Sequence, residues 1–186
     1  NEIILISIKT QKNNSVVTTF YSDRAKPFVK KYKFIKGFED GNLDFNSTKI
    51  NNVSKSTLII DNFKVKEIPV LAKILTLASL QGIADLLTGE GVRFTDFEMI
   101  YSNKGNLMTI DEIYAIGPAV SIMMEGYVES KKLVSLRGTL VPATTINRTI
   151  SSIPLLGDLL VGKKVGEGVF GVSFKIKGPP KDLKTR

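Results

Sequence analysis

Apolar and polar residues alternate along most of this chain, and a period of two is typical of β-strands that bury one face. Ile4, Ile6 and Ile8 share one face of the first run, and the β-branched run Ser15–Tyr21 follows after the polar stretch "QKNNS". Later runs repeat the pattern and are separated by Gly, Asn and Pro at hairpin spacing. The pattern predicts an antiparallel meander.

Two of the later runs lose this alternation part-way along. The run Thr57–Lys66 shifts phase after Ile60, and the run beginning at Gly91 does so after Phe94. A slip of one residue in an alternating strand implies a bulge or a change of face. We expect bulges near Asp61 and Thr95 that bend the strands and curve the sheet.

One long apolar segment has a helical pattern instead. Ile68–Leu87 opens with Pro69, carries an apolar stripe at helical spacing and is followed by Gly89. Lys73 and Asp85 interrupt its apolar character, so it is interpreted as an amphipathic helix that covers the sheet and not as a membrane span.

Shorter helical pieces complete the expected fold. The segment 144–162 is interrupted by Pro154 and Gly157, and one helical turn is expected near Pro27. We therefore expect one domain over residues 1–186. Its fold would be mainly β with helices (α+β), a curved antiparallel sheet forming a groove that one long amphipathic helix and short helical pieces cover or cap.

Composition narrows the possible functions. The chain has 186 residues, a net charge of +8, no Cys and no His. The charge permits anionic partners, but the Arg residues are spread from Arg24 to Arg186, without the basic and aromatic clustering of nucleic-acid interfaces. Disulfides, Cys or His metal ligands and Ser-His-Asp triads are excluded. We expect neither an enzyme nor a protein with a metal or cofactor, and no nucleic-acid partner.

The segment Gly166–Gly171 has the G-x-G-x-x-G spacing of phosphate-binding loops. In a dinucleotide-binding fold these glycines lead into a helix, whereas here they lead into an alternating strand. The few residues after Gly171 leave no room for the catalytic residues of a kinase. We expect no nucleotide partner, and we expect Gly162, Gly166 and Gly168 to form a tight turn.

Three stretches carry a resemblance to a known family. They are "SLQGIADLLTGEGVRFTDFE" from Ser79, "AIGPAVSIMMEGYVES" from Ala115 and "LRGTLVPATTINRTISSIPLLGDLLVGKKVGEGVFGVSFKIKGP" from Leu136. In this order they resemble the C-terminal region of the bacterial AsmA-like family, bridge-type proteins of the cell envelope. The chain departs from the family pattern after Pro142, where an aromatic residue is more usual.

The resemblance implies a fragment of a longer periplasmic protein that an N-terminal helix anchors in the inner membrane. In that family the long sheet curls into an apolar groove, thought to carry phospholipids toward the outer membrane. The implied function is a non-enzymatic module for phospholipid transport and outer-membrane biogenesis. The implied partners are phospholipid acyl chains, envelope membranes and, through edge strands, other envelope proteins.

An apolar inner face of such a sheet would solvate acyl chains by the same effect that builds a protein core. The expected groove-lining residues are apolar positions of the alternating runs: Ile60, Phe94, Val120, Ile122, Met124, Val134, Leu136, Leu140, Phe170, Val172, Phe174 and Ile176. Two alternatives remain open. The helix Ile68–Leu87 would fill the groove and make it an ordinary core, or the domain would be a lipid-free scaffold that assists outer-membrane assembly by pairing its edge strands.

Overall fold

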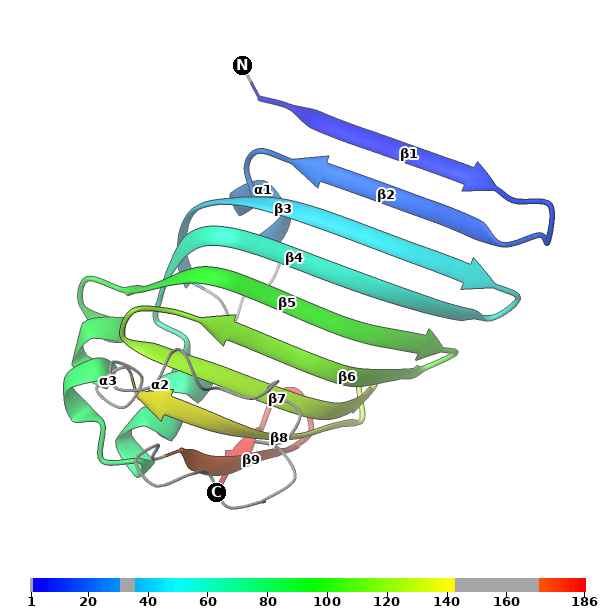
Figure 1. Ribbon diagram of the computed structural model, residues 1–186. Coiled ribbons are helices and arrows are strands. Elements are labelled where there is room, and N and C mark those ends of the chain that lie inside the picture. Colours follow the sequence, from blue (N-terminus) through cyan, green and yellow to red (C-terminus); the bar gives the residue numbers. More distant parts are fainter. Residues whose placement is uncertain (1, 31–35, 143–170) are drawn as a thin grey trace.

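A computed structural model describes residues 2–30, 36–142 and 171–186. Its ten strands form one antiparallel sheet in which each strand pairs with its neighbours in the sequence, in the order β1 to β10 (Figure 1). The strands are β1 Ile4–Thr10, β2 Val16–Ser22, β3 Lys36–Ile50, β4 Val53–Lys66, β5 Val92–Lys104, β6 Leu107–Ile116, β7 Val120–Glu129, β8 Leu133–Pro142, β9 Val172–Gly178 and β10 Lys184–Thr185. The helices are α1 Lys26–Val29, α2 Pro69–Leu77 and α3 Gln81–Thr88.

The predicted meander and the helical turn at Pro27 are confirmed, but the predicted α+β class is wrong. Strands make up 62% and helices 14% of the structure. The described part of the chain is therefore a mainly β fold built on a single sheet, with only short helices. None of the helices within the described residues is long and apolar enough to cross a membrane.

The single long helix predicted over Ile68–Leu87 is also wrong, because the segment forms two helices, α2 and α3. Ser79 lies between them with a left-handed φ of 58°. The backbone N–H of Leu80 donates to the carbonyl oxygen of Leu75 at 2.8 Å, and that of Ser79 to Thr76 at 3.0 Å. These two bonds form a Schellman motif, which ends a helix. The apolar stripe continues across the break, so hydrophobic periodicity alone does not reveal it.

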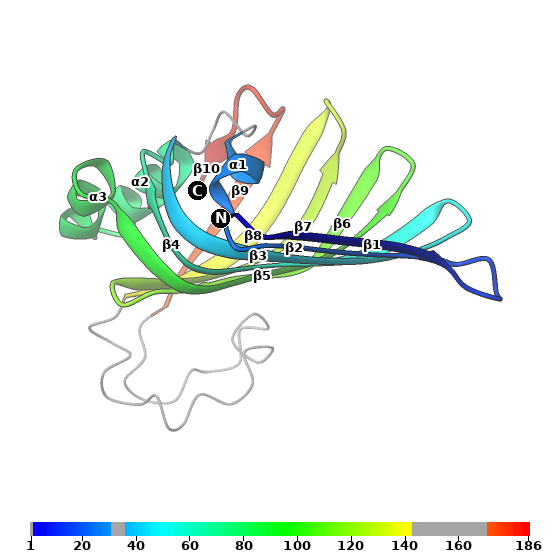
Figure 2. The same cartoon turned by 90° about the horizontal axis from the view of Figure 1, so that it is seen from above.

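The sheet is curved, and α2 and α3 lie together at one end of its strands (Figure 2). We define the concave face as the face whose side chains share the core with these helices. Burial of the apolar faces of α2 and α3 against this end of the sheet builds one continuous core. From the sheet it includes Leu43, Ile60, Phe63, Phe94, Ile122 and Leu140, and from the helices Leu71, Ile74, Leu75, Ala84 and Leu87.

The bulges predicted near Asp61 and Thr95 are wrong. β4 and β5 keep one register on both sides of these positions. Instead, Asn62 has a φ of 53°, and Gly41, which lies level with it in β3, has a φ of 80°. A left-handed residue in a strand changes the direction of the backbone and reverses the facing of the side chains that follow. The phase slip in the sequence is thus a change of face at a kink, and it keeps Phe63 in the core.

A bulge does occur in β6, between Ile110 and Ile113, where the register shifts against both neighbouring strands. The insertion places both isoleucines in buried positions, 5% and 7% exposed, although they are three residues apart. A bulge increases the local twist of a strand, so it adds to the curvature of the sheet.

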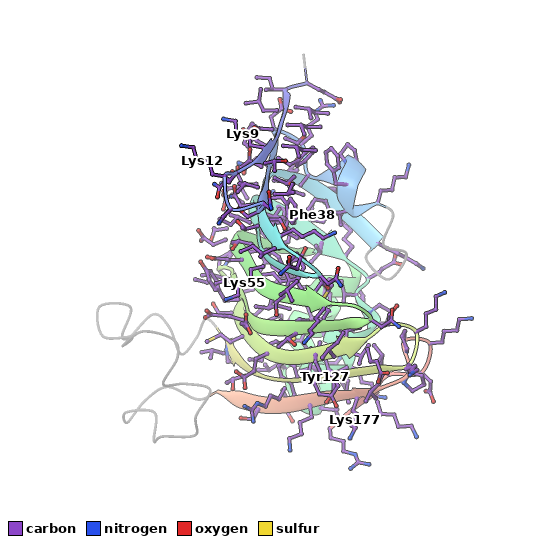
Figure 3. All side chains as sticks on the ribbon, turned by 90° about the vertical axis from the view of Figure 1, so that its right-hand side faces the viewer. Lys9, Lys12, Phe38, Lys55, Tyr127 and Lys177 are labelled. Carbon is purple, nitrogen blue, oxygen red and sulfur yellow. The ribbon has the colours of Figure 1, made fainter. Side chains whose placement is uncertain are left out.

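The convex face carries charged and polar side chains. Lys9 and Lys55 lie in one cross-strand row of this face, on the side of the sheet opposite Phe38 (Figure 3). Lys175 and Lys177 are exposed and alternate along β9 with buried apolar residues. These two lysines therefore lie on the face opposite the apolar positions of β9.

Two predictions concern segments outside the described residues. These are the helical pieces expected in 144–162 and the turn expected at Gly162, Gly166 and Gly168.

Candidate functional site

The strand register aligns apolar side chains across the concave face, one from each strand except where a glycine intervenes in β8. Neighbouring strands lie about 4.8 Å apart, so the row spans about 38 Å from β1 to β9. We term this set the apolar row. It consists of Ile6, Phe20, Phe45, Leu58, Met99, Ile113, Met124, Gly138 and Phe174.

Exposure changes along the apolar row. Ile6 in β1 is 65% exposed, whereas Ile113 and Phe174 are 7% and 6% exposed. Between these extremes, the apolar row residues of β2 to β5 are only partly buried. The row therefore has an open half, from β1 to β5, and a mostly closed half, from β6 to β9.

Gly138 shapes the closed half. A Cβ atom at this position would lie 2.2 Å from the carbonyl oxygen of Met123 and 2.7 Å from Cζ of Phe174. The missing side chain therefore allows the Phe174 ring to cover the backbone of β8, and it closes this part of the concave face.

The end of the concave face nearest the helices is closed core. The Phe38 and Phe63 rings stack with centroids 5.3 Å apart, and Phe63 stacks on Phe94 at 5.5 Å. Leu75 and Leu87 pack into the same cluster and are fully buried. Side chains at this end already have protein partners, so they are not free to contact a ligand.

On its other side the apolar row borders hydroxyl groups. Four of them lie side by side across β2 to β5, each two residues away from the member of the apolar row in its own strand: Thr18, Ser47, Ser56 and Tyr101. Ser56 Oγ donates a hydrogen bond of 2.9 Å to Ser47 Oγ. Along the open half, the concave face thus changes from apolar to hydroxyl-lined within about 7 Å.

The predicted groove residues that the structure describes lie together on the concave face, but in two environments. Met124, Val134, Leu136 and Val172 are partly buried, and Phe170 lies outside the described residues. The others are buried in the core: Ile60, Phe94, Val120, Ile122, Leu140, Phe174 and Ile176.

Sequence reasoning missed the partly exposed residues of the open half, Phe20, Phe45 and Leu58. The alternation of apolar and polar residues in the early strands does indicate which face of the sheet these three side chains share. What the sequence lacked was the position of the helices: α2 and α3 cover one end of the concave face, and Phe28 of α1 packs edge-on against Phe20 with the ring centroids 4.7 Å apart.

Carboxylates gather on the convex face, away from the apolar row. The Tyr114 hydroxyl donates a 2.5 Å hydrogen bond to Glu98, and this bond, with partial burial, raises the pKa of Tyr114 to about 12. Partial burial and the nearby charges of Asp96 and Asp44 raise the pKa of Asp61. Within the described part of the chain, no three acidic side chains are grouped so as to hold a metal ion.

Comparison of the chain with protein-family models, with curated protein sequences and with solved structures finds no match. The resemblance to the AsmA-like family therefore rests on the quoted motifs alone. Of these motifs, the G-T-L-V-P element lies in β8 and contains Gly138.

Proposed function

We propose that this protein is a non-enzymatic lipid-binding module whose concave face holds an acyl chain along the open half of the apolar row. The observation that supports this proposal is the run of partly exposed apolar side chains on neighbouring strands, with Phe20, Phe45 and Leu58 at its centre. A curved sheet with a continuous apolar row on its concave side offers a long, narrow contact surface, which suits a linear hydrocarbon chain.

The dimensions of the open half fit a single tail. Five strands, β1 to β5, span about 19 Å at the usual strand spacing. The hydrocarbon core of a bilayer is about 30 Å thick, so one tail extends about 15 Å. An acyl chain lying across the strands would therefore fit within the open half without entering the closed half.

The energetics favour temporary holding over tight storage. Burial of a methylene from water contributes about 0.8 kcal/mol. A face that covers one side of about twelve methylenes would contribute about 5 kcal/mol relative to water. A tail in a bilayer is already out of water and would gain little by moving to the protein. The face therefore suits a lipid in passage through an aqueous compartment.

The hydroxyl groups beside the open half suit the polar end of such a lipid. Ser47 and Thr18 would lie within about 7 Å of the tail, and hydroxyl groups donate hydrogen bonds to phosphate and ester oxygens. Ser56 is buried and already donates to Ser47, so it would position that hydroxyl group. The resemblance to the AsmA-like family supports a phospholipid as the ligand, a periplasmic location, and a role in phospholipid transport and outer-membrane biogenesis. These finer assignments belong to the same proposal.

Native mass spectrometry and photo-crosslinking test this function. We expect protein purified from a bacterial host to carry phospholipid. A photoreactive phenylalanine at Phe45 should crosslink to phospholipid, whereas the same group at Thr48, which lies on the convex face of the same strand, should not. A lipid-free protein, or equal crosslinking from the two positions, would overturn the proposal.

The exposed edge of β1 favours a second candidate, an envelope scaffold that assists outer-membrane assembly by edge-strand pairing, without lipid. Ile4, Ile6 and Ile8 in this edge strand are 50 to 67% exposed. A protein without lipid in the mass spectrum that carries another β-protein on β1 would support this candidate.

A further inference from the structure

The hairpin turns of the sheet lie at the end of the strands opposite α2 and α3 (Figure 2). One cross-strand row of the convex face, which runs from Lys9 through Lys55 and Tyr127 to Lys177, marks where this end begins. We term this row, together with the residues between it and the turns, the hairpin rim. It consists of residues 9–17, 48–55, 102–109, 127–135 and 177–184.

The hairpin rim carries the excess positive charge of the chain. It contains ten Lys and two acidic residues, Glu129 and Asp182, whereas the rest of the chain has 16 basic and 16 acidic residues. All ten lysines are exposed. Figure 3 looks onto this end of the molecule, with Lys9, Lys12 and Lys55 along it. The net charge of +8 is therefore concentrated at one end of the strands.

Ion pairs neutralise charges at the helix end of the strands but few in the hairpin rim. At the helix end, Lys64 and Lys66 pair with Glu39 at 2.7 and 3.8 Å. Of the ten rim lysines, all of which the structure describes, only Lys132 forms an ion pair, with Glu129 at 2.8 Å. The other nine have no acidic partner among the described residues, so their charge faces solvent.

Large apolar side chains are exposed among these lysines. Ile50, Leu107 and Tyr127 are 48%, 42% and 39% exposed. Ile50 and Leu107 each adjoin a two-residue turn, and Lys104 lies between them in the same cross-strand row. Lysines alone would keep this end soluble. A mixture of Lys with large apolar side chains is typical of surfaces that lie in the interface of a membrane.

The residue types of the hairpin rim favour a membrane over other anionic partners. Nucleic-acid interfaces use Arg for base edges and aromatic rings for stacking, and the rim has no Arg and one aromatic residue, Tyr127. The flexible Lys side chain acts as a point charge that can follow mobile lipid phosphates. A bilayer also accepts Ile50 and Leu107 beside its headgroups, which the phosphates of a nucleic acid would not.

We propose that the hairpin rim docks on an anionic bilayer, with its lysines at the lipid phosphates and with Ile50 and Leu107 among the headgroups. The strands fan out in the curved sheet (Figure 2), so a flat bilayer meets neighbouring turns and not all five at once. The three hairpins β3–β4, β5–β6 and β7–β8 carry five of the ten lysines and all three exposed apolar side chains. Each lysine near an anionic surface strengthens binding about fivefold.

Docking in this way would orient the concave face. Thr18 and Ser47 lie two residues nearer to the hairpin rim than Phe20 and Phe45 of the apolar row. The hydroxyl groups therefore lie between the bilayer and the apolar row, where the polar end of a lipid would meet them first. The inference goes beyond acyl-chain binding by the apolar row and does not depend on it.

Vesicle flotation tests the docking surface. The wild type should float with vesicles of equal parts phosphatidylcholine and phosphatidylglycerol, and not with phosphatidylcholine alone. Lys49→Glu combined with Lys104→Glu, on neighbouring hairpins, should weaken binding at least about 25-fold. The matched control combines Lys26→Glu with Lys73→Glu, at exposed lysines of α1 and α2. It changes the net charge equally but should weaken binding less than about threefold, because charges are screened beyond about 8 Å at physiological salt.

A fluorescent label tests whether the turns reach the headgroups, since the native chain has no Cys. An environment-sensitive dye on Leu107→Cys should shift its emission to the blue when the anionic vesicles are added. The same dye on Leu77→Cys, a 61% exposed position of α2, should not. An unchanged circular dichroism spectrum shows that each variant keeps the folded sheet.

Four outcomes would overturn the proposal. They are a wild type that does not float with the anionic vesicles, equal binding by the two double variants, equal emission shifts at the two labelled positions, and tighter binding to a DNA duplex than to the vesicles. Phospholipid that copurifies with the Lys49→Glu, Lys104→Glu variant would leave the proposed function intact. Vesicle docking without crosslinking at Phe45 would leave this inference intact, so the two proposals fail separately.

Discussion

Truncation of two leucines of α2 tests whether this helix closes one end of the concave face. Leu75 is fully buried, and Leu77, two residues later in the same helix, is 61% exposed. Replacement of either by Ala removes the same atoms and leaves a good helix former. Only the removal at Leu75 would open a cavity in the core that α2 and α3 form with the sheet.

The expected magnitudes differ clearly. Leu→Ala in a packed core costs about 2.7 to 5 kcal/mol, according to how far the cavity collapses. For Leu75→Ala we expect a loss of about 3.5 kcal/mol in the free energy of unfolding and, at 2 to 4 °C per kcal/mol, a Tm lower by about 10 °C. Leu77→Ala should stay within about 0.5 kcal/mol of the wild type.

Urea unfolding followed by circular dichroism measures both values, provided that the slope of the free energy against urea is the same for all three proteins. Equal effects of the two substitutions would refute the placement of α2. Phospholipid adds a second readout. If lipid restores the stability of Leu75→Ala, the tail reaches the space under the helices, and the division into an open and a closed half is wrong.

Three further substitutions, with Gly82→Ala as a control for one of them, test the backbone and the convex face. Asp61→Asn should raise the free energy of unfolding by about 0.5 kcal/mol near neutral pH. The raised pKa of Asp61 means that the folded protein loses stability as pH rises through that pKa, so the gain should vanish in urea unfolding at about pH 3. Gly138→Ala should lower the free energy of unfolding by about 1 to 3 kcal/mol, because the new Cβ would meet the Met123 carbonyl oxygen. A Cβ at Gly82 would meet nothing within 4 Å, so Gly82→Ala should leave the Tm unchanged or raise it when both variants are compared by thermal melting. Ser79→Gly should stabilise the protein by about 1 kcal/mol, because Ser79 has a left-handed φ, and an unchanged Tm would contradict this account of the helix break.

The sequence was sufficient to predict the meander, because period-two alternation and turn residues are local signals. It failed on α2 and α3, since the left-handed Ser79 interrupts the backbone without interrupting the apolar stripe. The prediction of bulges near Asp61 and Thr95 was wrong for a related reason. A kink at Asn62 and a bulge both shift the phase of an alternating strand, and the strand register, which the sequence does not encode locally, is needed to distinguish them.

The sequence predicted which side chains share one face of the sheet, but it did not predict which of them are exposed. Alternation correctly grouped residues such as Ile122, Leu140 and Phe174 on one side of the sheet. Which of them remain accessible depends on long-range packing, because α2 and α3 cover one end and the Phe174 ring fills the space above Gly138. The open residues Phe20 and Phe45 differ from these in lying away from α2 and α3, and only Phe28 of the short helix α1 packs on Phe20, at 4.7 Å between ring centroids.

The gradient of exposure along the apolar row bears on how a lipid would be handled. A conduit requires the row to be accessible from strand to strand along its whole length, and the row residues of β6 and β9, Ile113 and Phe174, are buried. The described part of the chain is therefore better suited to hold a tail in its open half than to pass it through to β9.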